Sequence, residues 1–172
     1  LPEGFSLENG SSVMKGVSPE SFVMRDGKQD WGDVTEALSG WREGIPTGPI
    51  RVQVGTRSWG LMHCKGKHKK SAIAAGYSDI ENFIAHVVDD RTEIIPLGKD
   101  ELGRESEFLV ARVEGNRLQD SAVIAWNDTK QYYTVKSAYS PTTNYLNNKK
   151  SPSPGSNPMA PAKTPAPIPS DT

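Results

Sequence analysis

Hydrophobic and polar positions alternate with a period of two along four stretches in the second half of the chain. These stretches are TEIIPL (92–97), SEFLVARVE (106–114), SAVIAW (121–126) and QYYTVKSAY (131–139). Such alternation is typical of half-buried β-strands. The NDTK turn (127–130) between the last two stretches favours a hairpin. We therefore expect this half of the chain to form an antiparallel meander.

A helical period precedes these strands. Apolar residues recur at helical spacing in one stripe, formed by Ile80, Phe83, Ile84, Val87 and Val88. Ser78 stands three residues before Glu81, which is the spacing of a capping box and predicts the start of this helix.

Three further elements are expected earlier in the chain. Asp33 and Glu36 resemble a second capping box, for a short helix that ends at Gly40. IRVQV (50–54) alternates as a strand does, and 60–75 is helix-like although glycine interrupts it.

This order of elements predicts an α+β fold, with N-terminal helices packed on one face of a four-stranded antiparallel meander. The polar, glycine- and serine-rich residues 1–30 are expected to be loosely ordered. Residues 31–146 form the expected folded domain. Pro, Ser and Ala dominate 147–172, which predicts a disordered tail.

Composition narrows the choice of function. The 172 residues carry a formal net charge of -1, so attraction to nucleic acid would have to come from a local patch rather than from the whole surface. The chain has one cysteine, which excludes an internal disulfide framework. It has no apolar run long enough to cross a bilayer. The chain begins at Leu1, and we expect it to be a piece of a longer polypeptide.

Such a local patch lies between positions 51 and 70, where every charged residue is positive. The residues are Arg51, Arg57, Lys65, Lys67, Lys69 and Lys70. The same segment holds His63, His68 and the single cysteine, Cys64. Three chemistries compete for this cluster: a metal site, a thiol nucleophile, and a site that binds and cleaves a phosphodiester.

The first two chemistries lack partners in the sequence. Structural zinc takes four ligands, usually in two spaced pairs, and no second cysteine is present. His86 lies on the polar shoulder of its helix, away from the apolar stripe. Cys64 has neighbouring lysines that could activate a thiol, but no motif supplies an orienting Asn or Asp. A small half-buried residue is the simpler interpretation of Cys64.

The phosphate chemistry fits better. On a helix, Lys65 would share a face with His68, and His63 would share one with Lys67. A histidine beside a fixed cation suits phosphodiester cleavage, because the cation stabilises charge on the phosphate while the imidazole transfers a proton. A solvated lysine-rich surface without function is the alternative.

The last strand supplies further candidates. Strict alternation places Tyr133, Val135, Ser137 and Tyr139 on one face and Lys136 on the other. Ser137 could donate a hydrogen bond to phosphate, and Tyr139 could stack on a base or donate its phenol. Both residue types are also common on half-exposed strands.

Five segments in this order resemble the barnase–EndoU–colicin–RelE-like superfamily of small metal-independent ribonucleases. They are WGDVTEAL (31–38), GPIRVQVG (48–55), GLMHCKGKH (60–68), YSDIENFIAHVVDD (77–90) and YYTVKSAY (132–139). The resemblance spans roughly 31–146 and is greatest to the branch found as C-terminal toxin domains of phage polyproteins and bacterial polymorphic toxins. Cys64 stands where that branch often has an aliphatic residue.

The resemblance implies an endoribonuclease that cleaves by transesterification and leaves 2′,3′-cyclic phosphate and 5′-hydroxyl ends. His63 or His68 would deprotonate the ribose 2′-hydroxyl, and Ser137 and Tyr139 would complete the catalytic pocket. The implied phosphate ligands are Arg57, Lys65, Lys67 and Thr142. No metal or cofactor is implied.

The implied partners are an RNA substrate and a cognate inhibitor, most simply an acidic one. Such a toxin would act in the cytoplasm of a target or host cell, delivered within a larger phage or secreted polypeptide. Two other functions remain open. A non-catalytic nucleic-acid-binding module would bind in a salt-dependent way without forming product, and a structural phage or scaffold fragment would not bind at physiological salt.

Overall fold

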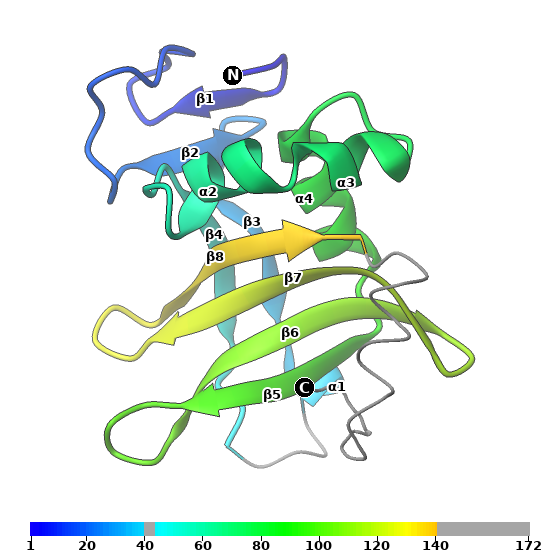
Figure 1. Cartoon of the computed structure of the whole chain (residues 1–172). Coiled ribbons are helices and arrows are strands. Elements are labelled where there is room, and N and C mark those ends of the chain that lie inside the picture. Colours follow the sequence, from blue (N-terminus) through cyan, green and yellow to red (C-terminus); the bar gives the residue numbers. More distant parts are fainter. Residues whose placement is uncertain (40–43, 141–172) are drawn as a thin grey trace. The chain divides into compact units, whose positions relative to one another are not determined.

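The structure is a computed structural model that describes residues 1–39 and 44–140. These residues form eight strands and four helices (Figure 1). The strands are β1 (Phe5–Leu7), β2 (Phe22–Arg25), β3 (Asp30–Val34), β4 (Gly48–Gln53), β5 (Glu93–Lys99), β6 (Glu105–Glu114), β7 (Arg117–Asn127) and β8 (Tyr132–Tyr139). The helices are α1 (Glu36–Ser39), α2 (Gly60–Lys67), α3 (Lys69–Ala74) and α4 (Ile80–Asp90). The predicted tail, 147–172, lies outside the described residues.

All eight strands belong to one mixed sheet with the order β1-β2-β4-β8-β7-β6-β5, and β3 pairs with β4 off this path. Every pair is antiparallel except β4 with β8. That parallel pair is short: its register joins only Ile50 to Tyr133 and Arg51 to Thr134. The rest of β8 therefore needs a different neighbour, and α2 supplies it.

The α+β class is confirmed, but the predicted arrangement is wrong. The four predicted C-terminal strands and the 127–130 hairpin are present as β5 to β8. The sheet also contains four earlier strands, three of which precede every helix. Two of those three, β1 and β2, have three and four residues, too few for an alternating pattern to stand out from a loop.

The N-terminal segment also differs from the expected loose attachment. Phe5, Val23 and Trp31 are buried in the main core, and the Phe5 and Trp31 rings lie 5.1 Å apart. The Trp31 indole Nε1 donates a hydrogen bond of 2.8 Å to the Val23 carbonyl. Burial of these aromatic groups attaches the segment, although its overall composition is polar.

At two helices the N-cap residue is not the one predicted but lies one or two positions after it. Asp33 belongs to β3, and the Thr35 hydroxyl accepts from the Leu38 amide at the start of α1. At α4 the cap is Asp79 rather than Ser78: its carboxylate accepts from the Asn82 amide at 2.8 Å. The predicted end of α1 at Gly40 lies outside the described residues.

Helix α4 carries the predicted apolar stripe into the core. Phe83, Ile84 and Val88 are fully buried, and the helix packs on β6 and β7. Figure 1 shows α4 behind β8, and no helix of the described residues covers the face of β5–β7 turned to the viewer. No helix among the described residues is long and apolar enough to cross a membrane.

Substituting Phe5 by alanine tests whether β1 belongs to the cooperative core. We expect the free energy of unfolding to fall by about 3 kcal/mol or more, the scale for truncating a buried phenylalanine. Urea denaturation followed by tryptophan fluorescence measures this change. The control Val13→Ala alters a side chain that is 65% exposed and should cost no more than about 0.5 kcal/mol. Equal values for the two variants would place β1 outside the core.

Candidate functional site

The candidate site lies where α2 packs against the second half of β8. The chain leaves β4 through a tight turn in which Gly55 and Gly60 both have positive φ, 70° and 82°. A Cβ on Gly55 would lie 2.1 Å from the Trp59 carbonyl oxygen, so only glycine fits there. The Met62 amide then donates to the Val54 carbonyl at 2.9 Å, which fixes the first turn of α2 to the end of the strand.

Two buried residues seat α2 in the core. Leu61 and Cys64 are fully buried, and the Cys64 side chain hydrogen-bonds to the backbone of Ala138 in β8. Burial raises the pKa of the Cys64 thiol to about 12. Cys64 is therefore a packing residue, because a thiol that stays protonated near neutral pH is a poor nucleophile.

His63 is oriented by the turn that precedes its helix. Its Nδ1 lies 2.7 Å from the Arg57 carbonyl oxygen. A carbonyl can only accept, so Nδ1 carries the hydrogen, and the Nε2 of a neutral His63 holds the lone pair. Arg57 thus contributes its backbone to the site, while the residue itself is exposed.

His68 occupies the break between α2 and α3, with φ −115° and ψ 8°. Its Nε2 lies 3.1 Å from the Ser137 hydroxyl oxygen. The His68 ring centroid is 5.2 Å from that of His63 and 5.7 Å from that of Tyr139. Four of the predicted site residues, from α2, from the break that follows it and from β8, therefore converge on one place.

The environment of His68 favours its neutral form. Burial lowers the pKa of His68 below its ordinary value of 6.5, and the positive charges of His63 and Lys67 lower that pKa further. A neutral imidazole near physiological pH can accept a proton, as a general base must.

A β-bulge in β8 brings Ser137 to this position. Val135 pairs with Ile124 and Ser137 pairs with Val123, so Lys136 is an extra residue in β8. The predicted strict alternation is therefore wrong. Tyr133 and Val135 are fully buried in the core together with Ala138. Ser137 and Tyr139, which pair with Val123 and Ser121, belong to the opposite face.

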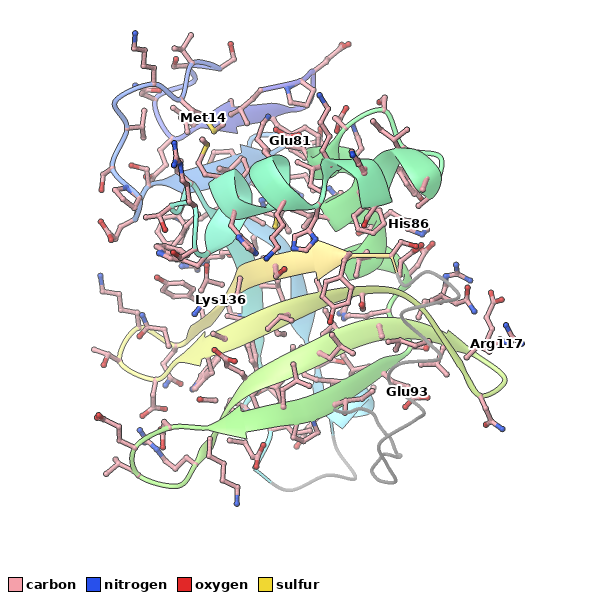
Figure 2. The ribbon with its side chains drawn as sticks, in the orientation of Figure 1. Met14, Glu81, His86, Glu93, Arg117 and Lys136 are labelled. Carbon is pink, nitrogen blue, oxygen red and sulfur yellow. The ribbon has the colours of Figure 1, made fainter. Side chains whose placement is uncertain are left out.

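The bulge also redirects Lys136, which alternation had assigned to the face away from Ser137. Lys136 lines one cavity together with Thr134 and Ala125 on the outer face of β7 and β8. Its Nζ lies 3.7 Å from Glu107, whose neighbour Phe108 points into the core. Lys136 therefore shares a face with Ser137. Figure 2 labels Lys136 on the strand. Sequence reasoning missed this cation, because no local pattern reveals the bulge.

Lys65 is not placed beside His68 as its spacing had suggested. Its Nζ lies 2.6 Å from the Glu81 carboxylate on α4. The Glu81 side chain is only 1% exposed, and its second oxygen, Oε1, is buried without a hydrogen-bond partner. A carboxylate in that position strongly favours a cation next to it. Lys65 therefore fastens α2 to α4 and is not free to bind phosphate.

Three residues named in the sequence analysis remain to be placed. Lys67 is exposed and lies close enough to His68 to affect its pKa. Thr142 lies outside the described residues. His86 contacts carboxylates and none of the other candidates that the structure describes: its Nδ1 lies 3.0 Å from Asp90 and its Nε2 lies 3.3 Å from Asp120. Residues 1–39 and 44–140 contain no group of three or more His, Cys, Asp or Glu side chains suited to a metal ion.

Comparisons with known proteins add no relative. No family model, no curated protein and no solved structure matches the chain. The candidate site is therefore defined by its own geometry.

Removing the Lys65 ammonium should destabilise the fold by leaving a buried charge. Lys65→Met is expected to lower the free energy of unfolding by about 3 kcal/mol, because breaking a buried pair strands the remaining partner. The double variant Lys65→Met/Glu81→Gln should recover much of this loss. Urea denaturation of the three proteins measures both effects, and a single variant as stable as wild type would contradict the role given to Lys65.

The pKa of His68 can be measured by histidine NMR titration. We expect its midpoint below 6.5, and we expect Lys67→Gln to raise it, because that change removes a nearby positive charge. Lys99→Gln, on β5, removes a cation elsewhere and should leave the midpoint unchanged. A His68 midpoint at or above 6.5 in wild-type protein would contradict the assignment of a neutral base.

Proposed function

We propose that the protein is a metal-independent endoribonuclease that cleaves RNA by internal transesterification. The observation that carries this proposal is the 3.1 Å contact between His68 Nε2 and the Ser137 hydroxyl, with the His63 ring 5.2 Å away. Two imidazoles beside a hydroxyl on an open face can supply both proton transfers of the reaction. The resemblance of residues 31–146 to small ribonucleases supports the same conclusion.

In this mechanism the two histidines take different roles. His68, whose pKa is lowered, accepts the proton of the ribose 2′-hydroxyl. The 2′-oxygen then attacks the adjacent phosphorus, and the bond from phosphorus to the 5′-oxygen breaks. His63, in its protonated form, donates a proton from Nε2 to the departing 5′-oxygen. The products are a 2′,3′-cyclic phosphate and a 5′-hydroxyl.

Charge on the phosphate oxygens is met by the surrounding side chains. Lys67 lies close enough to His68 to lower its pKa, and Lys136 directly precedes Ser137 in β8. Arg57, whose carbonyl holds His63, has an exposed side chain. Ser137 can donate its hydroxyl hydrogen to His68 or to a phosphate oxygen. The Tyr139 ring, 5.7 Å from His68, offers a surface for a base. Fixed donors of this kind stabilise charge as it develops in the transition state.

The proposal implies a toxic activity that acts inside a cell and that a producing cell must restrain. Four exposed basic residues flank the two histidines in the sequence and are called here the basic segment: Arg57, Lys67, Lys69 and Lys70. An inhibitor with an acidic surface would complement the charge of this basic segment and exclude RNA from the site.

Cleavage of total RNA in EDTA tests the mechanism. We expect discrete fragments with cyclic phosphate ends and no cleavage of a strand built from deoxyribose. His68→Ala should lower kcat/KM by about 10²–10⁴, the usual contribution of a positioned proton-transfer group. His86→Ala is the matched control, because this third histidine is bound to carboxylates on the α4 side and should leave cleavage unchanged.

Three outcomes would overturn the proposal. Wild-type cleavage by both His63→Ala and His68→Ala would remove the histidines from the reaction. Salt-dependent RNA binding without product would favour a non-catalytic binding module. A lack of both binding and product at physiological salt would favour a structural role.

A further inference from the structure

A cavity of about 1000 Å³ opens beside the candidate site, and Lys136 is the one residue of its lining that the mechanism above uses. It is bordered by β8, by the end of β4 with the turn that follows, and by the β5–β6 and β7–β8 hairpins. Its lining includes Phe22, Trp59, Thr134 and Lys136. A volume of this size exceeds the needs of one phosphate and its two riboses.

The cavity is continuous with the catalytic groups along two elements. Lys136 lines it and directly precedes Ser137 on the same face of β8. Trp59 lines it and directly precedes α2, which carries His63. Thr134 pairs with Ala125 and Ser137 with Val123, so across the bulge this part of β8 advances by only two residues of its partner, about 7 Å. A stacked nucleic-acid strand advances about 3.4 Å per nucleotide, so this length matches roughly two nucleotide steps.

The aromatic side chains of the cavity are suited to stacking. Trp59 does not belong to the hydrophobic core cluster, and its side chain is partly exposed. Phe22 is also partly exposed, and the Arg51 guanidinium lies 5.6 Å from its ring centroid. An indole that is neither packed in the core nor fully solvated offers a face to a planar ligand.

The cavity lining is balanced in charge, with four acidic residues (Glu20, Asp100, Glu105 and Asp128) and four basic ones (Lys99, Arg104, Lys130 and Lys136). Asp100 and Asp128 are both bound to Arg104, at 2.8 and 3.2 Å. Lys136 has only a loose contact with Glu107, 3.7 Å long and partly exposed on both sides. Such an exposed pair contributes little and is readily exchanged for a phosphate.

We propose that this cavity binds the single-stranded segment of RNA that flanks the scissile linkage, with Trp59 stacking on a base and Lys136 contacting a phosphate. This proposal rests on the ribonuclease function proposed above and adds a second contact region to it. Stacking tolerates any base, so the cavity selects unpaired strands rather than a sequence. A duplex would have to open before its bases could reach Trp59.

Binding of a fluorescein-labelled ten-residue deoxythymidine strand tests the proposal without any catalytic step. This probe has no 2′-hydroxyl and is not consumed, and its anisotropy reports Kd at several salt concentrations. Trp59→Leu should weaken Kd by about 5- to 100-fold with an unchanged salt dependence, because stacking releases no counterion. Lys136→Gln should reduce the slope of log Kd against log salt by about 0.7, the value for one phosphate contact on a single strand.

Lys15→Gln is the matched control, since it removes an exposed cation in the N-terminal segment outside the cavity. Circular dichroism and a urea melt verify that each variant is folded. Wild-type Kd and salt slope in both Trp59→Leu and Lys136→Gln would overturn the proposal. So would binding of a neutral extended peptide, but not of the strand, by the wild-type protein.

The two proposals fail separately. If the strand binds with the expected dependence on Trp59 and Lys136 but RNA is never cleaved, the cavity is a nucleic-acid site and the ribonuclease mechanism is wrong. If RNA is cleaved with cyclic ends while both variants bind the strand as wild type does, the mechanism stands and the cavity has no part in binding.

Discussion

The replacement of a strand by a helix beside β8 is the constraint on which the candidate site depends. β4 pairs with β8 through two residues only, and then the chain turns back through Gly55 and Gly60. α2 takes the place that β4 leaves, and Leu61 and Cys64 are buried against the sheet. Side chains of a helix and of a strand therefore meet at one seam. A strand in the same place would have presented its backbone to β8 instead.

An ion pair between α2 and α4 fixes the position of α2, in addition to the packing of its buried side chains. Glu81 is fully buried, and Lys65 is the cation that it contacts, so α2 and α4 are joined by a pair that is costly to break. Lys65, which the sequence spacing had assigned to phosphate binding, is instead bound to Glu81. The other lysines near the two histidines are Lys67, at the exposed end of α2, and Lys136, at the bulge in β8.

The seam also explains why two similar histidines have different environments. His63 is held by the Arg57 carbonyl on the rim of the turn. His68 stands at a helix break, in contact with Ser137, and burial depresses its pKa. The two imidazoles therefore have different hydrogen-bond partners, although they lie side by side.

The sequence by itself determined the local elements and the reactive groups. Alternation identified β5 to β8, helical spacing identified α4, and the titratable residues of 60–68 were recognised as a cluster, because period and turn chemistry depend on near neighbours only. Tertiary structure decided the rest: the bulge at Lys136, the partner of Lys65, the meeting of His68 with Ser137, and the burial of Trp31. These depend on contacts between residues far apart in the chain, whose pairing is settled by packing and by the cost of buried charge. A local sequence pattern does not show which distant residues will pair or which charges will be buried.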